Sequence, residues 1–156
     1  MRFFIVIIIS LFSNYSFAQN SDVKYQDDIY VVALQKYVSQ LKEIYTTDFY
    51  SENKKQIIYI KDEKYLDKIP GKINNYKIVK INDLNKHKYF KSRKPRLLTT
   101  IFPLKNKDGK CFINITPYQV TSEKNNYIQT VSDWTIVYFK NKNGIMTYDK
   151  IENGGI

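Results

Sequence analysis

The chain has only one cysteine, one histidine and one tryptophan among its 156 residues. Cys111, as the single cysteine, excludes an intramolecular disulfide, so the fold cannot depend on a disulfide framework. His87, as the single histidine, leaves any transition-metal site dependent on carboxylates, and the sequence predicts no metal and no cofactor. Phosphate-binding glycine loops, GxSxG elbows, HExxH and CxxC motifs are also missing from the sequence. We therefore assign no catalytic residue from spacing alone.

Long hydrophobic runs are missing too, apart from a short one at the N-terminus. Met1-Arg2 is followed by an apolar stretch over residues 3–12, which only Ser10 interrupts, and Ser16-Phe17-Ala18 has the small residues of a cleavage site. About ten apolar residues are too few for a membrane span, which needs about 20. The pattern predicts a signal peptide over residues 1–18, cleaved after Ala18, and a secreted or periplasmic protein with no membrane span. No cysteine follows the cleavage site, so nothing supports a lipoprotein anchor.

Negative charge is scarce relative to positive charge. Cleavage would leave residues 19–156, a length typical of one domain, and would lower the formal charge from +10 to +9 by removing Arg2. Such a surface attracts nucleic acid, lipid headgroups or acidic polysaccharide. Twenty-two of the 25 basic residues are lysine, however, whereas bidentate phosphate recognition favours arginine. We interpret the charge mainly as compositional, and export disfavours nucleic acid as a partner.

The first half of the chain predicts a helix followed by short elements. An amphipathic helix is expected to begin at Asp27 or Asp28, because a carboxylate there can accept hydrogen bonds from the first free amides. Strands are expected at 56–61 and 76–81, with helical turns at 63–68 and 83–90. The apolar positions of the helix recur every three or four residues: Tyr30, Ala33, Leu34, Tyr37, Val38, Leu41, Ile44 and Tyr45.

The second half is rich in strand patterns. Asp108-Gly109 and Asn143-Gly144 each stand between apolar runs, and such dipeptides accept the positive φ angles of tight hairpin turns. Two hairpins are therefore expected, and Pro103 and Pro117 are expected near strand ends or bulges. The order of elements predicts an α+β fold, with the N-terminal amphipathic helix packed on a mainly antiparallel sheet that ends in the C-terminal hairpins. The short late connections disfavour a parallel α/β sheet.

The densest cluster of positive charge comes just before the second half. No acidic residue lies between Lys86 and Arg96, and Tyr89 and Phe90 are interleaved with the cations. One interpretation is an anion-binding surface; the other is a solvated charged loop whose two aromatic residues are buried. The candidate anion-binding residues are Lys86, Lys88, Lys91, Arg93, Lys94 and Arg96.

Tyrosine is abundant, with thirteen residues remaining after cleavage. Trp134, Tyr138 and Tyr148 are the candidates for an aromatic interaction patch, because such rings bury area and still form hydrogen bonds. Alternation places Trp134, Ile136 and Tyr138 on one face of a strand, and Thr135, Val137 and Phe139 on the other. Both faces are apolar enough to be buried, so core packing explains most of these rings.

Catalysis has two remaining routes. His87 and Cys111 could meet only in the folded chain, and nothing around Cys111 marks it as a nucleophile; burial as a small hydrophobic residue is its simpler role. The adjacent acidic pairs at 27–28 and 62–63 stand where helices are expected to begin, and acidic residues are favoured there for structural reasons.

Several segments carry a resemblance to known proteins. The signal ends in Ser16-Phe17-Ala18-Gln19-Asn20, the body is rich in Lys, Asn, Ile and Tyr, and the segments IFPLKNKDG (101–109) and IENGGI (151–156) follow. In these features the chain is similar to small secreted and periplasmic proteins of Bacteroidota-type bacteria. The resemblance implies an exported single domain and carries over no catalytic residue.

We therefore expect an exported, non-enzymatic binding domain that engages a protein or an anionic envelope component. A small hydrolase whose site assembles only in the fold, and an anion-binding module using residues 86–96, are the alternatives.

Overall fold

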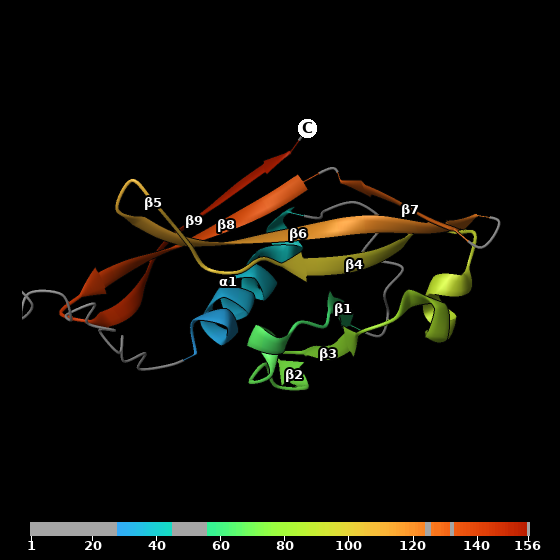
Figure 1. Ribbon diagram of the computed structural model, residues 1–156, viewed down its shortest axis with the longest axis horizontal. Coiled ribbons are helices and arrows are strands. Elements are labelled where there is room, and N and C mark those ends of the chain that lie inside the picture. Colours follow the sequence, from blue (N-terminus) through green and yellow to red (C-terminus); the bar gives the residue numbers. More distant parts are fainter. Residues whose placement is uncertain (1–27, 45–55, 124–125, 132, 156) are drawn as a thin grey trace, which may run out of the picture.

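The computed structural model describes residues 28–44, 56–123, 126–131 and 133–155. One helix packs on a single mixed, mostly antiparallel sheet that curls beside it, so the chain has the α+β fold that the sequence predicts (Figure 1). The expected signal peptide at 1–18 and the expected helix residue Tyr45 lie outside the described residues.

Helix α1 (Ile29–Ile44) begins where the sequence indicates. The side chain of Asp28 accepts a hydrogen bond from the amide of Tyr30 at 2.9 Å, which satisfies one of the free donors of the first turn. Five members of the expected apolar face are buried, Ala33, Leu34, Tyr37, Val38 and Leu41, and Tyr30 is half-buried. Ile29, which was not expected on this face, is buried with them. No helix within the described ranges is long and apolar enough to cross a membrane.

Seven strands of the sheet form one row, and two more strands pair with the fifth strand of that row. The row runs β2 (Lys72–Ile73), β3 (Tyr76–Ile81), β1 (Ile57–Lys61), β4 (Arg96–Ile101), β6 (Lys110–Glu123), β8 (Asp133–Lys142) and β9 (Ile145–Gly155). Strands β5 (Lys105–Lys107) and β7 (Asn126–Val131) pair with β6. Three short 3₁₀ turns connect the early strands: η2 (Lys64–Leu66), η3 (Leu84–Lys86) and η4 (Lys88–Lys91).

Both predicted hairpins are present. Asp108 and Gly109 join β5 to β6, and Asn143 and Gly144 join β8 to β9, all four with positive φ. Parallel pairing was not predicted, yet β1 pairs in parallel with both β3 and β4. The connections from β1 to β3 and from β3 to β4 are fourteen residues each, which is long enough for a crossover.

Strand β6 pairs with four other strands of the sheet, β4, β5, β7 and β8. Along one edge it pairs with β8 over Cys111–Ile115 and then with β7 over Tyr118–Glu123. Pro117 lies inside β6 and not near its end, at the point where one neighbour replaces the other. A residue without an N–H is tolerated there because the ladder is interrupted. Pro103 lies between β4 and β5, as expected.

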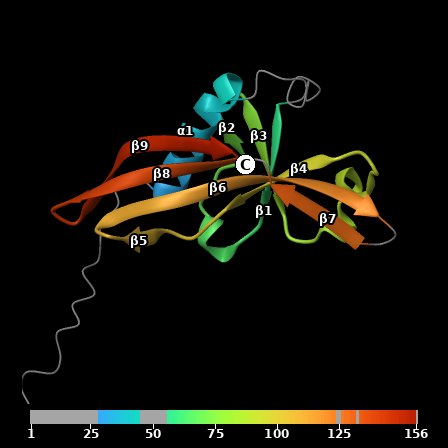
Figure 2. The same ribbon diagram turned by 90° about the horizontal axis from the view of Figure 1, so that it is seen from above.

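The two faces of the sheet support two hydrophobic clusters. The larger cluster joins α1 to one face, through residues such as Ile60, Ile101 and Ile115. The smaller cluster lies on the other face and contains Ile81, Phe90, Leu98 and Val120. In Figure 2 the β8–β9 hairpin and β5 lie at one end of the molecule and β7 lies at the opposite end.

Candidate functional site

The face of the sheet that α1 does not cover carries two features that could bind a ligand. Ile58 and Ile60 of β1 belong to the helix-side cluster, so the alternating residues Tyr59 and Lys61 project from the opposite face. On β4 the same alternation places Leu98 and Thr100 on that face. An aromatic stack and a pocket lie side by side here.

The aromatic stack consists of Tyr59, His87, Tyr89, Phe90 and Arg96. The rings of Tyr59 and Tyr89 lie nearly parallel, with centroids 4.2 Å apart, and the guanidinium of Arg96 covers Tyr89 at 4.7 Å from the ring centroid. His87 meets Tyr59 edge-on, at 5.3 Å between ring centroids. Phe90 is fully buried and closes the stack on the side of the smaller cluster.

Burial has the largest effect on the pKa values of the two tyrosines of the stack. It raises the pKa of the Tyr89 hydroxyl above its ordinary value, while the neighbouring Arg96 guanidinium acts in the opposite direction. Burial also raises the pKa of Tyr59, and Tyr89 adds to that effect. Nδ1 of His87 and Nε of Arg96 are buried and have no hydrogen-bond partner among the described residues. The tyrosines therefore stay neutral at physiological pH, and Arg96 brings a permanent positive charge to the stack.

The pocket, of about 500 Å³, lies between η3 and the strands β1, β4, β6 and β7. Its walls combine three tyrosine and phenylalanine rings with amide and hydroxyl groups. They are formed by Lys61, Ile81, Asn82, Asp83, Leu84, Asn85, Leu98, Thr100, Phe102, Tyr118, Tyr127 and Gln129. Half of these side chains are apolar or aromatic and half are polar. Small-molecule sites likewise combine apolar surface with polar groups that orient the ligand.

Strand topology explains where the pocket forms. From β1 the chain passes to β3 on one side and then returns to β4 on the other, so the two connections diverge at the carboxyl ends of these parallel strands. In open sheets with parallel strands, ligands bind in crevices of this kind. Lys61 ends β1, and residues 81–85 contain the end of β3 and its exit.

The charges of the pocket are balanced. Nζ of Lys61 lies 2.8 Å from a carboxylate oxygen of Glu63. The carboxylate of Asp83 accepts a hydrogen bond from the amide of Asn85 at 2.9 Å and lies 3.8 Å from Nζ of Lys86. Both ionic groups are thus partnered, and the remaining polar groups are neutral. The pocket suits an uncharged polar ligand.

The predicted basic segment begins immediately beyond the pocket. Lys86 ends η3, Lys88 and Lys91 lie on η4, and these three side chains are exposed. Arg93 and Lys94 are exposed in the following loop, whereas Arg96 begins β4 and is half-buried over Tyr89. The structure therefore brings the segment to one end of the molecule, where the 3₁₀ turns stand apart from the sheet (Figure 1).

The predicted aromatic patch is divided between the two faces. Trp134 and Tyr138 share one face of β8, as expected from alternation. Tyr148 pairs with Phe139, which is buried on the helix side, and Nζ of Lys36 of α1 lies 4.4 Å from the centre of the Tyr148 ring. A register shift of β8 and β9 between Tyr138 and Phe139 causes this separation, because moving by one residue exchanges the faces.

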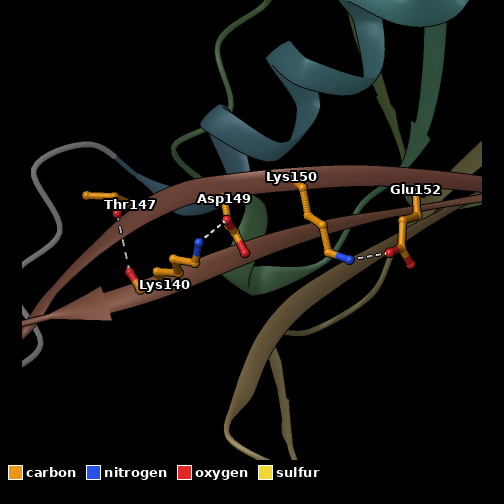
Figure 3. A network of polar contacts seen from close by, with 5 residues as sticks. All are labelled: Lys140, Thr147, Asp149, Lys150 and Glu152. Atoms are coloured by element: carbon orange, nitrogen blue, oxygen red, sulfur yellow. Dashed lines mark hydrogen bonds and ion pairs between the residues drawn. The ribbon is translucent and has the colours of Figure 1, made fainter.

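Polar contacts occupy the area between these aromatics. Tyr138 donates a hydrogen bond to Glu152 at 2.9 Å, and Lys150 donates another to the same carboxylate. Figure 3 shows the contact of Lys150 with Glu152 on β9, and beside it the ion pair between Lys140 of β8 and Asp149 of β9. This part of the hairpin is a surface of satisfied polar groups.

The structure separates His87 from Cys111. Cys111 packs partly buried against the helix-side cluster, whereas His87 contacts Phe90 of the smaller cluster. Cys111 and Val120, the member of the smaller cluster on the same strand, stand nine positions apart on β6, which corresponds to about 30 Å of extended chain. The two side chains cannot form a nucleophile pair in this fold. Among the described residues, no three histidine, cysteine or carboxylate side chains gather into a metal site.

The pocket residues were not identified from the sequence as a site. Asp83 begins the helical turn expected at 83–90, and its side chain accepts a hydrogen bond from the amide of Asn85. Tyr118, Tyr127 and Gln129 come from β6 and β7, which pair with each other far along the chain from η3. No local spacing connects them to η3, so no sequence motif could have identified the pocket.

No protein-family model matches the chain, and neither a curated protein nor a solved structure matches it. The fold and the geometry of the uncovered sheet face are therefore the observations from which a function is argued.

Proposed function

We propose that this protein is an exported binding domain that holds an uncharged, polyhydroxylated group, the chemistry of a sugar unit, in the pocket between η3 and β7. The observation that carries the proposal is the composition of the pocket walls. Rings of Phe102, Tyr118 and Tyr127 offer flat apolar surface, and Asn85 and Gln129 offer amide donors and acceptors. A sugar unit presents the complementary combination of C–H faces and hydroxyl groups.

Binding without turnover fits the acidic groups available there. Glycoside hydrolysis ordinarily uses two carboxyl groups on either side of the bond that is cleaved. Asp83 is the only carboxylate among the described residues that line the pocket. It is already held by the amide of Asn85 and lies near Lys86. This arrangement supports a binding role more than an acid–base role.

Alternate residues of β7 provide a matched test of the pocket. Gln129 lines the pocket, whereas the side chain of the next residue, Thr130, projects from the opposite face of the same strand. Isothermal titration of the protein with a panel of neutral oligosaccharides should identify a ligand that Gln129→Ala weakens by about fivefold and Thr130→Ala leaves unchanged, since losing one hydrogen bond costs about 1 kcal/mol. Equal affinity of both variants would contradict the proposal.

Turnover is the second outcome to measure. Cleavage of a bound oligosaccharide that disappears in Asp83→Asn would replace the binding proposal with hydrolysis. Intact oligosaccharide after prolonged incubation, detected by mass spectrometry, would support binding alone.

Export is tested separately from ligand binding. The full chain expressed in a Gram-negative host should yield a periplasmic product whose first residue is Gln19, as read by N-terminal sequencing. A cytoplasmic product that retains Met1 would contradict export without affecting the pocket.

A further inference from the structure

The end of the molecule beside the pocket carries an unbalanced group of cations. We define the cationic surface as Lys88, Lys91, Arg93, Lys94 and Arg96. Lys88 and Lys91 stand three residues apart on the 3₁₀ turn η4, so their side chains project from the same side of the turn. Four of the five residues are exposed, and Arg96 is half-buried.

Nearby acidic groups do not neutralise this surface. Asp83 at the start of η3 pairs with Lys86, which lies outside the surface as defined. Glu123 is the last residue of β6 and lies three residues beyond Val120, the residue that pairs with Arg96 of β4. Among the described residues, the ion pairs join none of these five cations to a carboxylate. The surface therefore keeps an excess of positive charge.

The guanidinium of Arg96 packs against an aromatic ring, whereas the side chains of the other four cations are exposed. Its guanidinium lies over the Tyr89 ring, and Tyr89 in turn lies over Tyr59, so the cation stands on two stacked rings. Its Nε atom is buried without a hydrogen-bond partner among the described residues, although the residue keeps part of its exposure. The side chain can therefore be approached only through the rest of its guanidinium. An arginine held against a ring among exposed lysines can orient one anionic group while the lysines attract several others.

We propose that the cationic surface binds the anionic groups, carboxylate or sulfate, of an acidic polysaccharide. A repeating anion matches cations spread over η4, the loop and the start of β4 better than a single small anion does. The site is independent of the pocket, but η3 connects the two, because Leu84 lines the pocket and the cations follow directly after Lys86. A chain that places a neutral sugar in the pocket can place its charged groups on this surface.

The stack disfavours single-stranded nucleic acid as the partner. Nucleic-acid surfaces of this class use free aromatic faces on which bases stack. Here one face of Tyr89 is covered by Tyr59 and Arg96 lies over the ring, while Phe90 is fully buried. A lipid surface is disfavoured as well, since the large exposed apolar side chains of the described residues, Ile128, Ile145 and Tyr148, lie on β7 and β9 and not on η4.

Two triple variants with the same change of net charge test the proposal. K88Q/K91Q/K94Q removes three exposed lysines from the cationic surface, and K105Q/K107Q/K110Q removes three exposed lysines from the β5–β6 hairpin at the opposite end of the molecule. Binding to dextran sulfate and to polygalacturonate, measured by isothermal titration, should weaken about tenfold or more in the first variant and less than about threefold in the second. Neutral dextran serves as the uncharged probe.

Three further measurements distinguish the kinds of anionic ligand and the role of Arg96. The first variant should also flatten the dependence of log Kd on log salt concentration, because fewer counterions are released. The two polyanions distinguish sulfate from carboxylate as the preferred group. Arg96→Lys keeps the charge but loses the planar group, and we expect it to weaken binding of the preferred polyanion.

Equal weakening by the two triple variants would overturn the proposal, because it would mean that net charge alone is sensed. Tighter binding of an oligothymidylate than of either polysaccharide at matched charge would favour nucleic acid instead. Binding to phosphatidylglycerol vesicles but to neither polysaccharide would favour a lipid surface. None of these results would alter the test of the pocket with neutral sugars.

Discussion

At the scale of single residues, the indole ring of Trp134 packs against the backbone of Gly154. The two residues are paired across β8 and β9, and a Cβ atom at position 154 would lie 2.2 Å from Cζ2 of the indole ring. Gly154→Ala should therefore displace the ring and lower the free energy of unfolding by about 1–3 kcal/mol, as overpacking commonly does. Urea denaturation followed by tryptophan fluorescence measures the change.

Two further variants control this prediction. Gly71→Ala adds the same methyl group where no atom lies within 4 Å, and it should leave stability nearly unchanged. In a Trp134→Ala background, which lacks the chain's single tryptophan and is followed by circular dichroism, the cost of Gly154→Ala should disappear. A Gly154→Ala protein as stable as the parent would show that the indole moves without cost.

The carboxylate of Glu152 gives a prediction about pH. Hydrogen bonds from Lys150 and, to a lesser extent, from Tyr138 hold the pKa of Glu152 below its ordinary value of 4.5. A carboxylate with a lowered pKa in the folded state stabilises the fold above pH 4.5, and that contribution is lost as the pH falls through the lowered value. Tyr138→Phe removes one donor, so the pKa of Glu152 should rise toward 4.5.

Nuclear magnetic resonance titration of the side-chain carboxyl carbon reports this shift directly. Tyr148→Phe is the matched control, because Tyr148 lies on the helix side of the hairpin, under Lys36. A pKa that is the same in both variants and the parent would mean that the hydroxyl of Tyr138 does not hold the carboxylate in solution.

At the scale of secondary-structure elements, short sequence patterns predicted the features that depend on residues close together in the chain. The capping carboxylate of Asp28 and the apolar face of α1 follow from short-range spacing, and so do the two hairpin turns with their positive φ angles. Alternation also placed Trp134 and Tyr138 on one face correctly. Tyr148, grouped with them only as an aromatic residue, lies on the opposite face, because the register shift within the hairpin is not visible in the alternation of one strand.

Two features of the sheet were not predicted, β7 and the parallel pairings. β7 has only Tyr127, Ile128 and Val131 as apolar residues, a weak strand pattern, and it pairs with the preceding strand β6. Parallel pairing joins β1 to β3 across the fourteen residues 62–75 and to β4 across the 34 residues 62–95, and neither connection contains a long helix. The pocket is a product of these same pairings, so it could not be predicted before them.

The start of α1 provides a prediction at this scale. Asp28→Ala removes the acceptor that binds the amide of Tyr30, so the free energy of unfolding should fall by about 1 kcal/mol. Asp28→Asn keeps a side-chain oxygen and should recover most of the loss. Urea denaturation followed by circular dichroism measures both variants. A loss in Asp28→Asn equal to that in Asp28→Ala would assign the effect to charge and not to capping.

At the scale of the whole molecule, one sheet supports two clusters on opposite faces. Tyr59 and Ile60 are consecutive in β1, yet the first packs on the smaller cluster and the second belongs to the helix-side cluster. β6 connects the clusters as well, since Ile115 belongs to one and Val120 to the other. The ligand-binding features thus stand on strands whose reverse sides form the main core, which gives them a rigid base.

This arrangement predicts that the molecule unfolds as one unit. Phe90→Ala removes the fully buried ring at the centre of the smaller cluster and should lower the free energy of unfolding by about 3–5 kcal/mol. Because the strands are shared, the circular dichroism of α1 and the fluorescence of Trp134 should move together to the same lower urea midpoint. Leu34→Ala, fully buried in the helix-side cluster, should move both signals in the same way. If Phe90→Ala left the signal of α1 at its original midpoint, the smaller cluster would be a separately unfolding unit, and the cationic surface built on it could then order on binding without involving the rest of the fold.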